Sequence, residues 1–337
     1  MGKDKSNVAG ISSAPDGGDF YEKTDTPPKK LTPSRGNPSE GESPPPNNQL
    51  PKLDVEGSSP FARSFSASIC HTPAKEYHLW KQVSCSQLKC LADSPAEFYG
   101  RHEARDTPPK SSSALDWGTL VHTWVEIGHD EYQQREAIAP VSVTTATGQL
   151  GKAAEAWLKD LPPDAIPISL ADSIKLRAQT AQLMENPASR ELLEGAIDKE
   201  FNVRFQMGGH DCRCRVDGAT LDSFWDIKTV RDSDPDKSFG WAARDWKYDL
   251  QAAYYGIAAQ QLGWPKHSLK FIATSNVYPY HCAVLELPRS VLDAAEARCL
   301  ELLDELQARR AANYWLPDFY GEVLEVPAHI FQRGKKW

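Results

Sequence analysis

Three segments in the second half of the chain alternate between apolar and polar residues, as half-buried β-strands do. The alternation predicts strands over 200–207, 211–217 and 224–230. Gly208-Gly209 and Gly218-Ala219 follow the first two, and glycine at such points favours tight turns. Because the link between the second and third segments is short, these two strands are expected to be antiparallel neighbours.

Apolar residues at helical spacing lie before and after these strands. Before them, the pattern predicts helices within 84–102 and over 117–134, 151–161 and 170–195. After them, it predicts a helix over 248–262, a strand pair over 270–277 and 282–287, and a long helix over 291–312. The charged run between 231 and 247 is interpreted as a solvated loop. This order predicts an α/β fold with a central mixed β-sheet flanked by helices.

The first 60 residues have a different composition. They hold ten of the 25 prolines, and Ser, Gly, Asn and charged residues fill most of the rest. Such a segment buries too little apolar surface to offset the entropy lost on ordering. We therefore expect a disordered tail over 1–60 and one folded domain over 61–337.

Charge and cysteine content narrow the class of protein. The net charge of -8 argues against coating nucleic acid through bulk charge, although a local basic groove remains compatible with it. Seven irregularly spaced cysteines suit reduced thiols. The sequence has no 18-residue apolar run and no apolar core of a secretory signal at its start. A cytoplasmic protein with no membrane partner is expected.

Two aspartates and a lysine gather on the second and third strands. Alternation places Arg213, Arg215 and Asp217 on one face of their strand. Asp226 and Lys228 share a face of the next strand, so the two carboxylates are expected to lie close together. Paired carboxylates repel unless a cation or a proton lies between them, and Mg²⁺ prefers oxygen ligands. The backbone carbonyl of Ile227 is a further candidate ligand.

An acid-x-Lys triplet is weak evidence alone, and Asp245-Trp246-Lys247 is a second such triplet outside any predicted strand. The two strands by themselves leave a structural ion-pair cluster as an equal alternative to a metal site. His122, in Gly-Thr-Leu-Val-His at the start of a predicted helix, is a candidate metal ligand, with Glu126 one turn on as a weaker one. Gln251 and Tyr255 share one helix face beside alanines, suited to hydrogen-bonding a phosphate or a metal-bound water. Each also fits ordinary burial.

Taken in order, these residues resemble the PD-(D/E)XK nucleases of the RecB, lambda-exonuclease and RecE type. That branch has a helical His, an Asp, an Asp/Glu-x-Lys and a Gln-x-x-x-Tyr. The motifs Ser84-Cys-Ser-Gln-Leu-Lys89, Ser94-Pro-Ala-Glu-Phe-Tyr99 and Gly118-Thr-Leu-Val-His122 resemble the opening of RecE-type nuclease domains. The resemblance covers about residues 75 to 315 and implies a restriction-endonuclease-like core.

The resemblance implies degradation of double-stranded DNA ends, 5′ to 3′, in recombination or repair. It implies Mg²⁺, with Mn²⁺ as a substitute, and a homo-oligomer that works with a single-strand annealing recombinase. By the family pattern His122, Asp217 and Asp226 would be ligands, Lys228 the catalytic lysine, and Gln251 and Tyr255 orienting residues. Glu200 matches a further acidic position of some members.

Some relatives carry an iron–sulfur cluster, but Cys212 and Cys214 are predicted to face the core and a C-terminal cysteine triplet is lacking, so no cluster is expected. Arg213 and Arg215 are the candidate DNA-phosphate ligands. Two alternatives stay open: an endonuclease or nickase of the same fold, and a catalytically inactive DNA-binding scaffold. The intact Asp217, Asp226 and Lys228 argue against the second.

Overall fold

The computed structural model describes residues 67–108, 113–145, 150–265 and 269–317. All of them belong to one compact unit, Asn48–Trp337. The predicted tail over 1–60 lies outside the described residues, so the tail and the boundary at residue 61 stay predictions.

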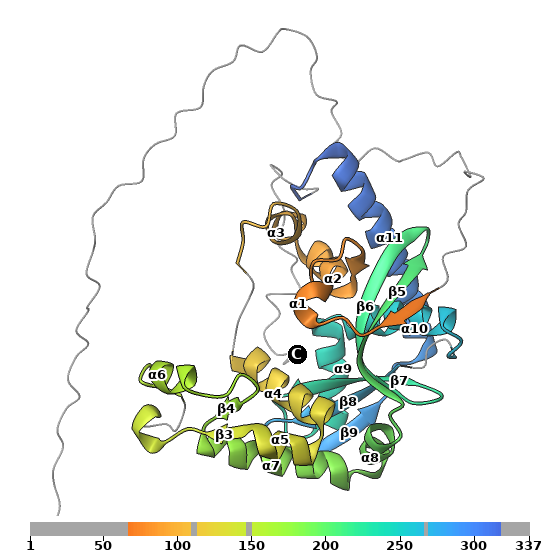
Figure 1. Cartoon of the computed structure of the whole chain (residues 1–337). Helices are drawn as coiled ribbons and strands as arrows, with labels where there is room; N and C mark the ends of the chain where they lie inside the picture. The colour runs from red at the N-terminus through yellow and green to blue at the C-terminus, as the bar shows by residue number, and fades with distance from the viewer. Residues whose placement is uncertain (1–66, 109–112, 146–149, 266–268, 318–337) are drawn as a thin grey trace, which may run out of the picture. The chain divides into compact units, whose positions relative to one another are not determined.

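A seven-stranded mixed sheet forms the centre of this unit (Figure 1). The main path is β1-β5-β6-β7-β8-β9, and β2 pairs with β6. The pairs β7–β8 and β2–β6 are parallel and the others antiparallel. The strands are β1 (Ser68–Cys70), β2 (Val83–Ser84), β5 (Asp198–Met207), β6 (His210–Ala219), β7 (Phe224–Val230), β8 (Leu269–Ser275) and β9 (Cys282–Leu285).

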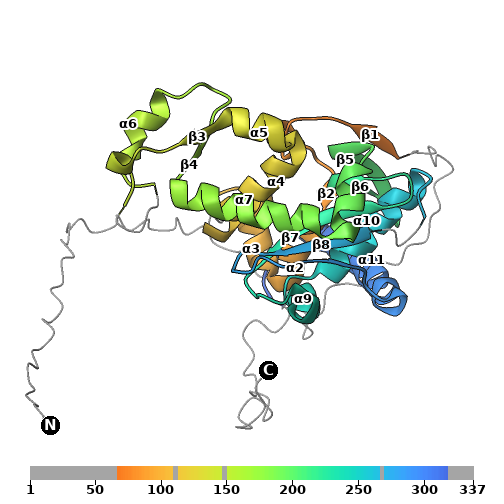
Figure 2. The ribbon, with the colours of Figure 1, turned by 90° about the horizontal axis from the view of Figure 1, so that it is seen from below.

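Helices cover both faces of the sheet (Figure 2), and each face has its own apolar core. One core takes residues from α2 (Cys85–Asp93), α3 (Pro95–Phe98), α9 (Pro235–Asp245), α10 (Tyr248–Gln261) and α11 (Arg289–Ala312). The other takes residues from α4 (Ser113–Ile127), α5 (His129–Arg135), α7 (Leu170–Glu185) and α8 (Pro187–Glu194).

Smaller elements complete the described chain. A two-stranded parallel sheet pairs β3 with β4. The remaining elements are α1 (Ala74–Tyr77), η1 (Tyr99–Glu103, a π-helical turn), β3 (Glu136–Ile138), η2 (Val141–Val143, a 3-10 turn), α6 (Ala154–Lys159) and β4 (Ile166–Ile168).

The predicted α/β fold is confirmed, and local sequence signals account for most element ends. Ser84 caps α2 with a capping box in which the Gln87 side chain accepts from the Ser84 amide. Gly128, with φ 83°, ends the single helix predicted over 117–134 and separates α4 from α5. Asn186 and Pro187 divide the predicted 170–195 helix into α7 and α8.

Two local predictions were wrong. The run 231–247, predicted to be a loop, contains helix α9. Pro235 stands at its first position, and Phe239 and Ala243, four residues apart, are buried. Gly218-Ala219 was predicted to form a turn, yet both residues pair with β7, and the chain reverses after them.

Candidate active site

The candidate site lies where β6 and β7 separate. These strands pair only through Gly218↔Trp225 and Ala219↔Phe224. Asp217 and Asp226 would be the next pair, but β6 diverges there. The Ile227 amide, left without a β6 partner, donates instead to Asp217 Oδ2 over 2.7 Å. The carboxylate therefore occupies the fork between the strands and satisfies a backbone donor that would otherwise be orphaned.

Gly218 permits the close approach that precedes the fork. A Cβ atom at this position would lie 2.0 Å from Cζ2 of the buried Trp225 indole. The ring therefore occupies the space over the backbone of residue 218, which only glycine leaves open. This packing holds the last paired rung of the two strands next to Asp217.

His122, Glu200 and Asp217 form one cluster on the α4 side of the sheet, with ligand atoms within 4.8 Å of one another. His122 Nδ1 lies 3.4 Å from Asp217 Oδ2 and 3.7 Å from Glu200 Oε1. Glu200 lies opposite Asp217 at a break in the β5–β6 ladder, and its φ of 50° marks a local departure from strand geometry. The structure therefore brings His122, a candidate metal ligand, next to Asp217, and its role as a ligand stays a prediction.

The raised pKa values of two residues in this cluster are typical of a site with excess negative charge. Burial, and after it the Asp226 carboxylate, raises the pKa of Asp217 to about 7, against the opposing effect of His122. Burial alone would lower the pKa of His122, but Asp217 and then Glu200 outweigh it, and the pKa rises to about 9. The cluster thus retains protons near neutral pH that a divalent cation would displace.

Asp226 lies beside this cluster and is almost fully buried. Lys228 forms an ion pair with the Asp226 carboxylate, with Nζ 2.8 Å from Oδ1. Burial by itself would lower the pKa of Lys228, but Asp226 and then Asp217 outweigh it and raise the pKa. The lysine is therefore a persistent positive charge at the site.

Helix α10 supplies Gln251 and Tyr255, whose side chains have different hydrogen-bond partners at the site. Gln251 Nε2 donates to Asp226 Oδ1 over 2.7 Å. The Tyr255 hydroxyl donates to the backbone carbonyl of Arg215 over 2.7 Å, two residues before Asp217. Gln251 therefore orients a carboxylate, whereas Tyr255 holds the β6 backbone and leaves its hydroxyl committed to that contact.

The arginines on β6 have partners within the protein. Arg213 is buried, stacks on the Tyr77 ring and donates to the Tyr77 carbonyl. Arg215 is partly exposed, and its Nε donates to Glu200 Oε2 over 2.7 Å. Arg213 is thus held away from solvent, while Arg215 joins the acidic cluster through Glu200. Their contact with DNA stays a prediction.

Of the remaining candidates, Glu126 lies one turn beyond His122 on α4 and is exposed. Partial desolvation and then the Glu200 carboxylate raise the pKa of Glu126, which places it at the edge of the same acidic group. The Asp245-Trp246-Lys247 triplet is separate from the site. Asp245 pairs with Arg244 and Lys247 with Asp93.

The donor set fits a hard divalent cation. Two carboxylates and an imidazole converge from β5, β6 and α4, with the Asp226 carboxylate of β7 beside them, and oxygen-rich sets of this kind suit Mg²⁺ or Mn²⁺. Both oxygens of the buried Asp226 carboxylate contact the Lys228 ammonium. His122, Asp217 and Glu200 would hold the ion, with Asp226 adjacent. The Ile227 carbonyl as a ligand stays a prediction.

Two residues that sequence analysis did not single out also reach the site. Lys89 of α2 donates to Gln251 Oε1 over 3.2 Å. The Tyr248 ring has the ammonium groups of Lys89 and Lys228 each 5.0 Å from its centroid. Lys89 belongs to the Ser84–Lys89 motif and Tyr248 begins α10, so both residues lie in segments that the sequence pattern identified. The contacts of Lys89 with Gln251 and Tyr248 depend on how α2 packs on α10.

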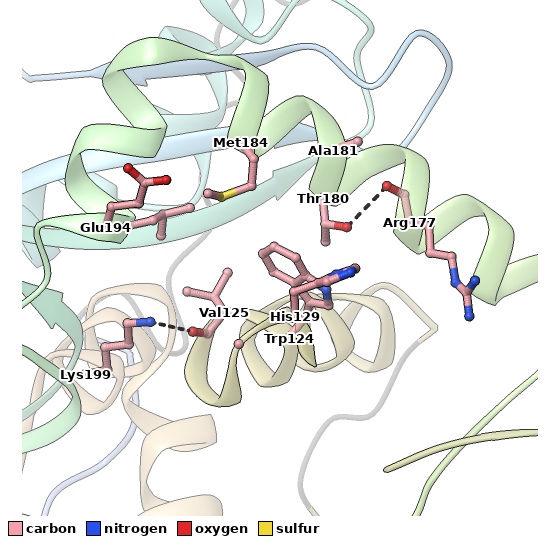
Figure 3. A pocket seen from close by; sticks show the side chains of 11 residues that line it. Trp124, Val125, His129, Arg177, Thr180, Ala181, Met184, Glu194 and Lys199 are labelled. Carbon is pink, nitrogen blue, oxygen red and sulfur yellow. Dashed lines mark hydrogen bonds between the residues drawn. The ribbon is translucent and has the colours of Figure 1, made fainter. Parts of the chain in front are cut away.

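A cavity of about 470 Å³ lies at the C-terminal end of α4, and neither Asp217 nor Asp226 lines it (Figure 3). Its walls are mostly apolar and include Trp124, Val125 and Met184. The Lys199 ammonium points to the Val125 carbonyl and donates to it over 3.0 Å. This contact joins α4 to β5 one residue before Glu200, so it helps to fix the spacing between His122 and Glu200.

Cys212 and Cys214 are buried in the core, as their alternation predicted, and the described cysteines are free thiols. Among the described helices, none combines the length and the apolar character needed to cross a bilayer.

Comparison with known proteins agrees with this geometry. Residues 84–318 match the family described as "PDDEXK-like domain of unknown function (DUF3799)". The fold is similar to a crystal structure of a "Putative exonuclease" from Eubacterium rectale, with a TM-score of 0.51 at 16% identity. That match covers 76% of this chain and 94% of the other. No curated protein sequence matches the chain.

Proposed function

Because the chain belongs to the PDDEXK-like family DUF3799, whose match spans 84–318, we propose that it is a metal-dependent nuclease that hydrolyses DNA. One observation carries the proposal. Asp217 and Asp226 meet at the fork between β6 and β7, with Lys228 paired to Asp226. The same three residues are those of the nuclease motif that the sequence resembles, so geometry and motif support one site.

The charges of this site suit phosphodiester hydrolysis. A bound Mg²⁺ or Mn²⁺ would activate water and neutralise charge on the phosphate. Lys228, whose pKa the carboxylates raise, stays protonated near neutral pH. It is therefore suited to stabilising negative charge on a phosphate oxygen and unsuited to act as a general base. Gln251 fixes the Asp226 carboxylate through its amide.

The finer proposal is an exonuclease that takes double-stranded DNA ends, 5′ to 3′, with Mg²⁺ in recombination or repair. It would act as a homo-oligomer with a single-strand annealing recombinase as partner. Support comes from the RecE-like opening motifs together with the ordered arrangement of His122, Asp217, Asp226 and Lys228. The name of the Eubacterium rectale protein is consistent with this activity.

The test is degradation of linear duplex DNA with Mg²⁺ by the wild type, Asp226→Asn and Lys228→Met. The chain contains its own control, because Asp245 and Lys247 form the same triplet outside the site. Asp245→Asn and Lys247→Met should retain full activity. The two site variants should lose at least about 10³-fold, roughly 4 kcal/mol of barrier. Circular dichroism should show that both remain folded.

Closed circular DNA distinguishes the alternatives. An exonuclease degrades the linear duplex and leaves the circle intact, while an endonuclease or nickase opens the circle. DNA labelled at its 5′ or 3′ end gives the polarity. A wild type that binds DNA but is inert with both Mg²⁺ and Mn²⁺ would contradict the nuclease proposal and favour the binding scaffold.

A further inference from the structure

Lys89 lies at the start of a chain of contacts that ends on the central carboxylate of the site. Its ammonium donates to Gln251 Oε1 over 3.2 Å, and Gln251 Nε2 donates to Asp226 Oδ1 over 2.7 Å. The three residues come from α2, α10 and β7, which are far apart in sequence. A single carboxamide thus links a cation on one helix to the carboxylate on the sheet.

This link has a direction, because a carboxamide accepts at one end and donates at the other. If the Gln251 amide turned over, its NH₂ would face the Lys89 ammonium and its oxygen would face the Asp226 carboxylate. Both contacts would then be repulsive. Gln251 is only 8% exposed, so water cannot readily take the place of either partner. The lysine and the aspartate together therefore select one amide orientation.

The surroundings of Lys89 are unusual for a lysine serving only a structural role. Within the described chain it has no carboxylate within 4 Å, and its contacts are the neutral amide oxygen and the Tyr248 ring. The same ring lies 5.0 Å from the Lys228 ammonium. Holding an ammonium in a partly buried place without a counter-ion is costly, although the aromatic face offsets part of that cost. Tyr248 also keeps both lysines at the site.

We propose that Lys89 is a positioning residue of the nuclease site, which fixes the Gln251 amide so that its N–H side faces Asp226. The inference rests on the proposed function for its kinetic readout. It goes beyond that function by giving the Ser84–Lys89 motif a role in the geometry of the site.

The first measurement does not need activity. Protein labelled with ¹⁵N-glutamine shows the side-chain NH₂ pair of Gln251, assigned by its absence in Gln251→Leu. In the wild type these protons should be shifted downfield and exchange slowly, because one donates to a buried carboxylate. Lys89→Met should move or broaden the pair, whereas Lys89→Arg should retain it. The control Lys159→Met, on the remote helix α6, should leave it unchanged.

The second measurement is the kinetics of DNA hydrolysis. Lys89→Met should lower kcat about ten-fold or more with KM for DNA unchanged, since an oriented hydrogen bond to a charged partner is lost. The double variant Lys89→Met/Gln251→Leu should be no slower than Gln251→Leu alone, because both act through one amide. Lys89→Arg should recover part of kcat.

Two results would overturn the proposal. One is a Gln251 signal that is identical in the wild type and Lys89→Met. The other is a higher KM in Lys89→Met that adds to the Gln251→Leu effect and becomes weaker in high salt, which would make Lys89 a phosphate contact. A wild type without nuclease activity would refute the proposed function alone, because the amide signals still decide the role of Lys89.

Discussion

Metal affinity should depend steeply on pH, because the ligands of the candidate site hold protons near neutrality. The pKa of His122 is raised to about 9 and that of Asp217 to about 7. Binding a cation requires neutral imidazole and ionised carboxylate. Raising the pH from 7 to 9 is therefore the perturbation that tests the assignment of these two residues as ligands.

The size of the effect follows from the two pKa values. At pH 7 about 1% of His122 is neutral and about half of Asp217 is ionised, so freeing the imidazole costs roughly 2.7 kcal/mol at about 1.36 kcal/mol per pH unit. At pH 9 about half of His122 is neutral and nearly all of Asp217 is ionised. The apparent affinity should rise about 100-fold over this range. Below pH 7 the dependence should steepen toward two protons per ion.

Calorimetric titration of the DNA-free protein with Mg²⁺ at pH 6, 7, 8 and 9 measures this dependence. Two buffers of different ionisation enthalpy at pH 7.5 count the protons released, and we expect about one per ion. His129→Gln, at a histidine that lines the cavity instead of the site, should behave as the wild type does. An affinity that is flat between pH 7 and 8, or binding without proton release, would refute His122 as a ligand.

Two further outcomes follow from the same contacts. In the metal-free protein both folded-state pKa values lie above the unfolded ones, so each group stabilises the fold most at low pH. Tm should fall as the pH rises, because of Asp217 between about pH 4 and 7 and because of His122 between about pH 6.5 and 9. Saturating Mn²⁺ at pH 8 should restore the Tm. A Tm that rises between pH 5 and 8 without metal would contradict this prediction. Gly218→Ala should lower the free energy of unfolding by about 1–3 kcal/mol, a Tm loss of several degrees, because the new Cβ meets Trp225. Gly240→Ala, in open space on α9, is the matched control and should not destabilise; equal melting of both variants would disprove the packing argument.

The strands and most helices could be predicted because their signals are local. The predicted strand over 224–230 matches β7 to the residue, and the predicted 248–262 helix differs from α10 by one residue. Helix α9 was missed because charged residues are interleaved throughout the run 231–247. Its buried residues, Pro235, Phe239 and Ala243, are spaced four apart, and Pro235 at the first position was the clue that a helix begins there.

The site could be predicted where alternation along a strand determines the direction of a side chain. It could not be predicted where the packing of one element on another determines that direction. Alternation placed Asp226 and Lys228 together, and they form an ion pair. Alternation also placed Arg213 on the same face as Arg215, but Tyr77 of α1 packs over Arg213 and covers it. Lys89 reaches Gln251 only because α2 packs against α10, and periodicity within either helix carries no information about that contact.

The way in which the two aspartates meet departs from the simplest expectation. A continuous antiparallel ladder would place Asp217 directly opposite Asp226 on one face of the sheet. Instead Asp217 lies beside His122 of α4, and Asp226 accepts a hydrogen bond from Gln251 of α10. Because β6 and β7 pair over only two rungs, the sheet opens at this point, and Asp217 binds the Ile227 amide inside the gap. The fork thus gives residues from both faces access to one place, so changes that close it, for example by extending the β6–β7 ladder, should abolish the site while preserving every residue of the motif.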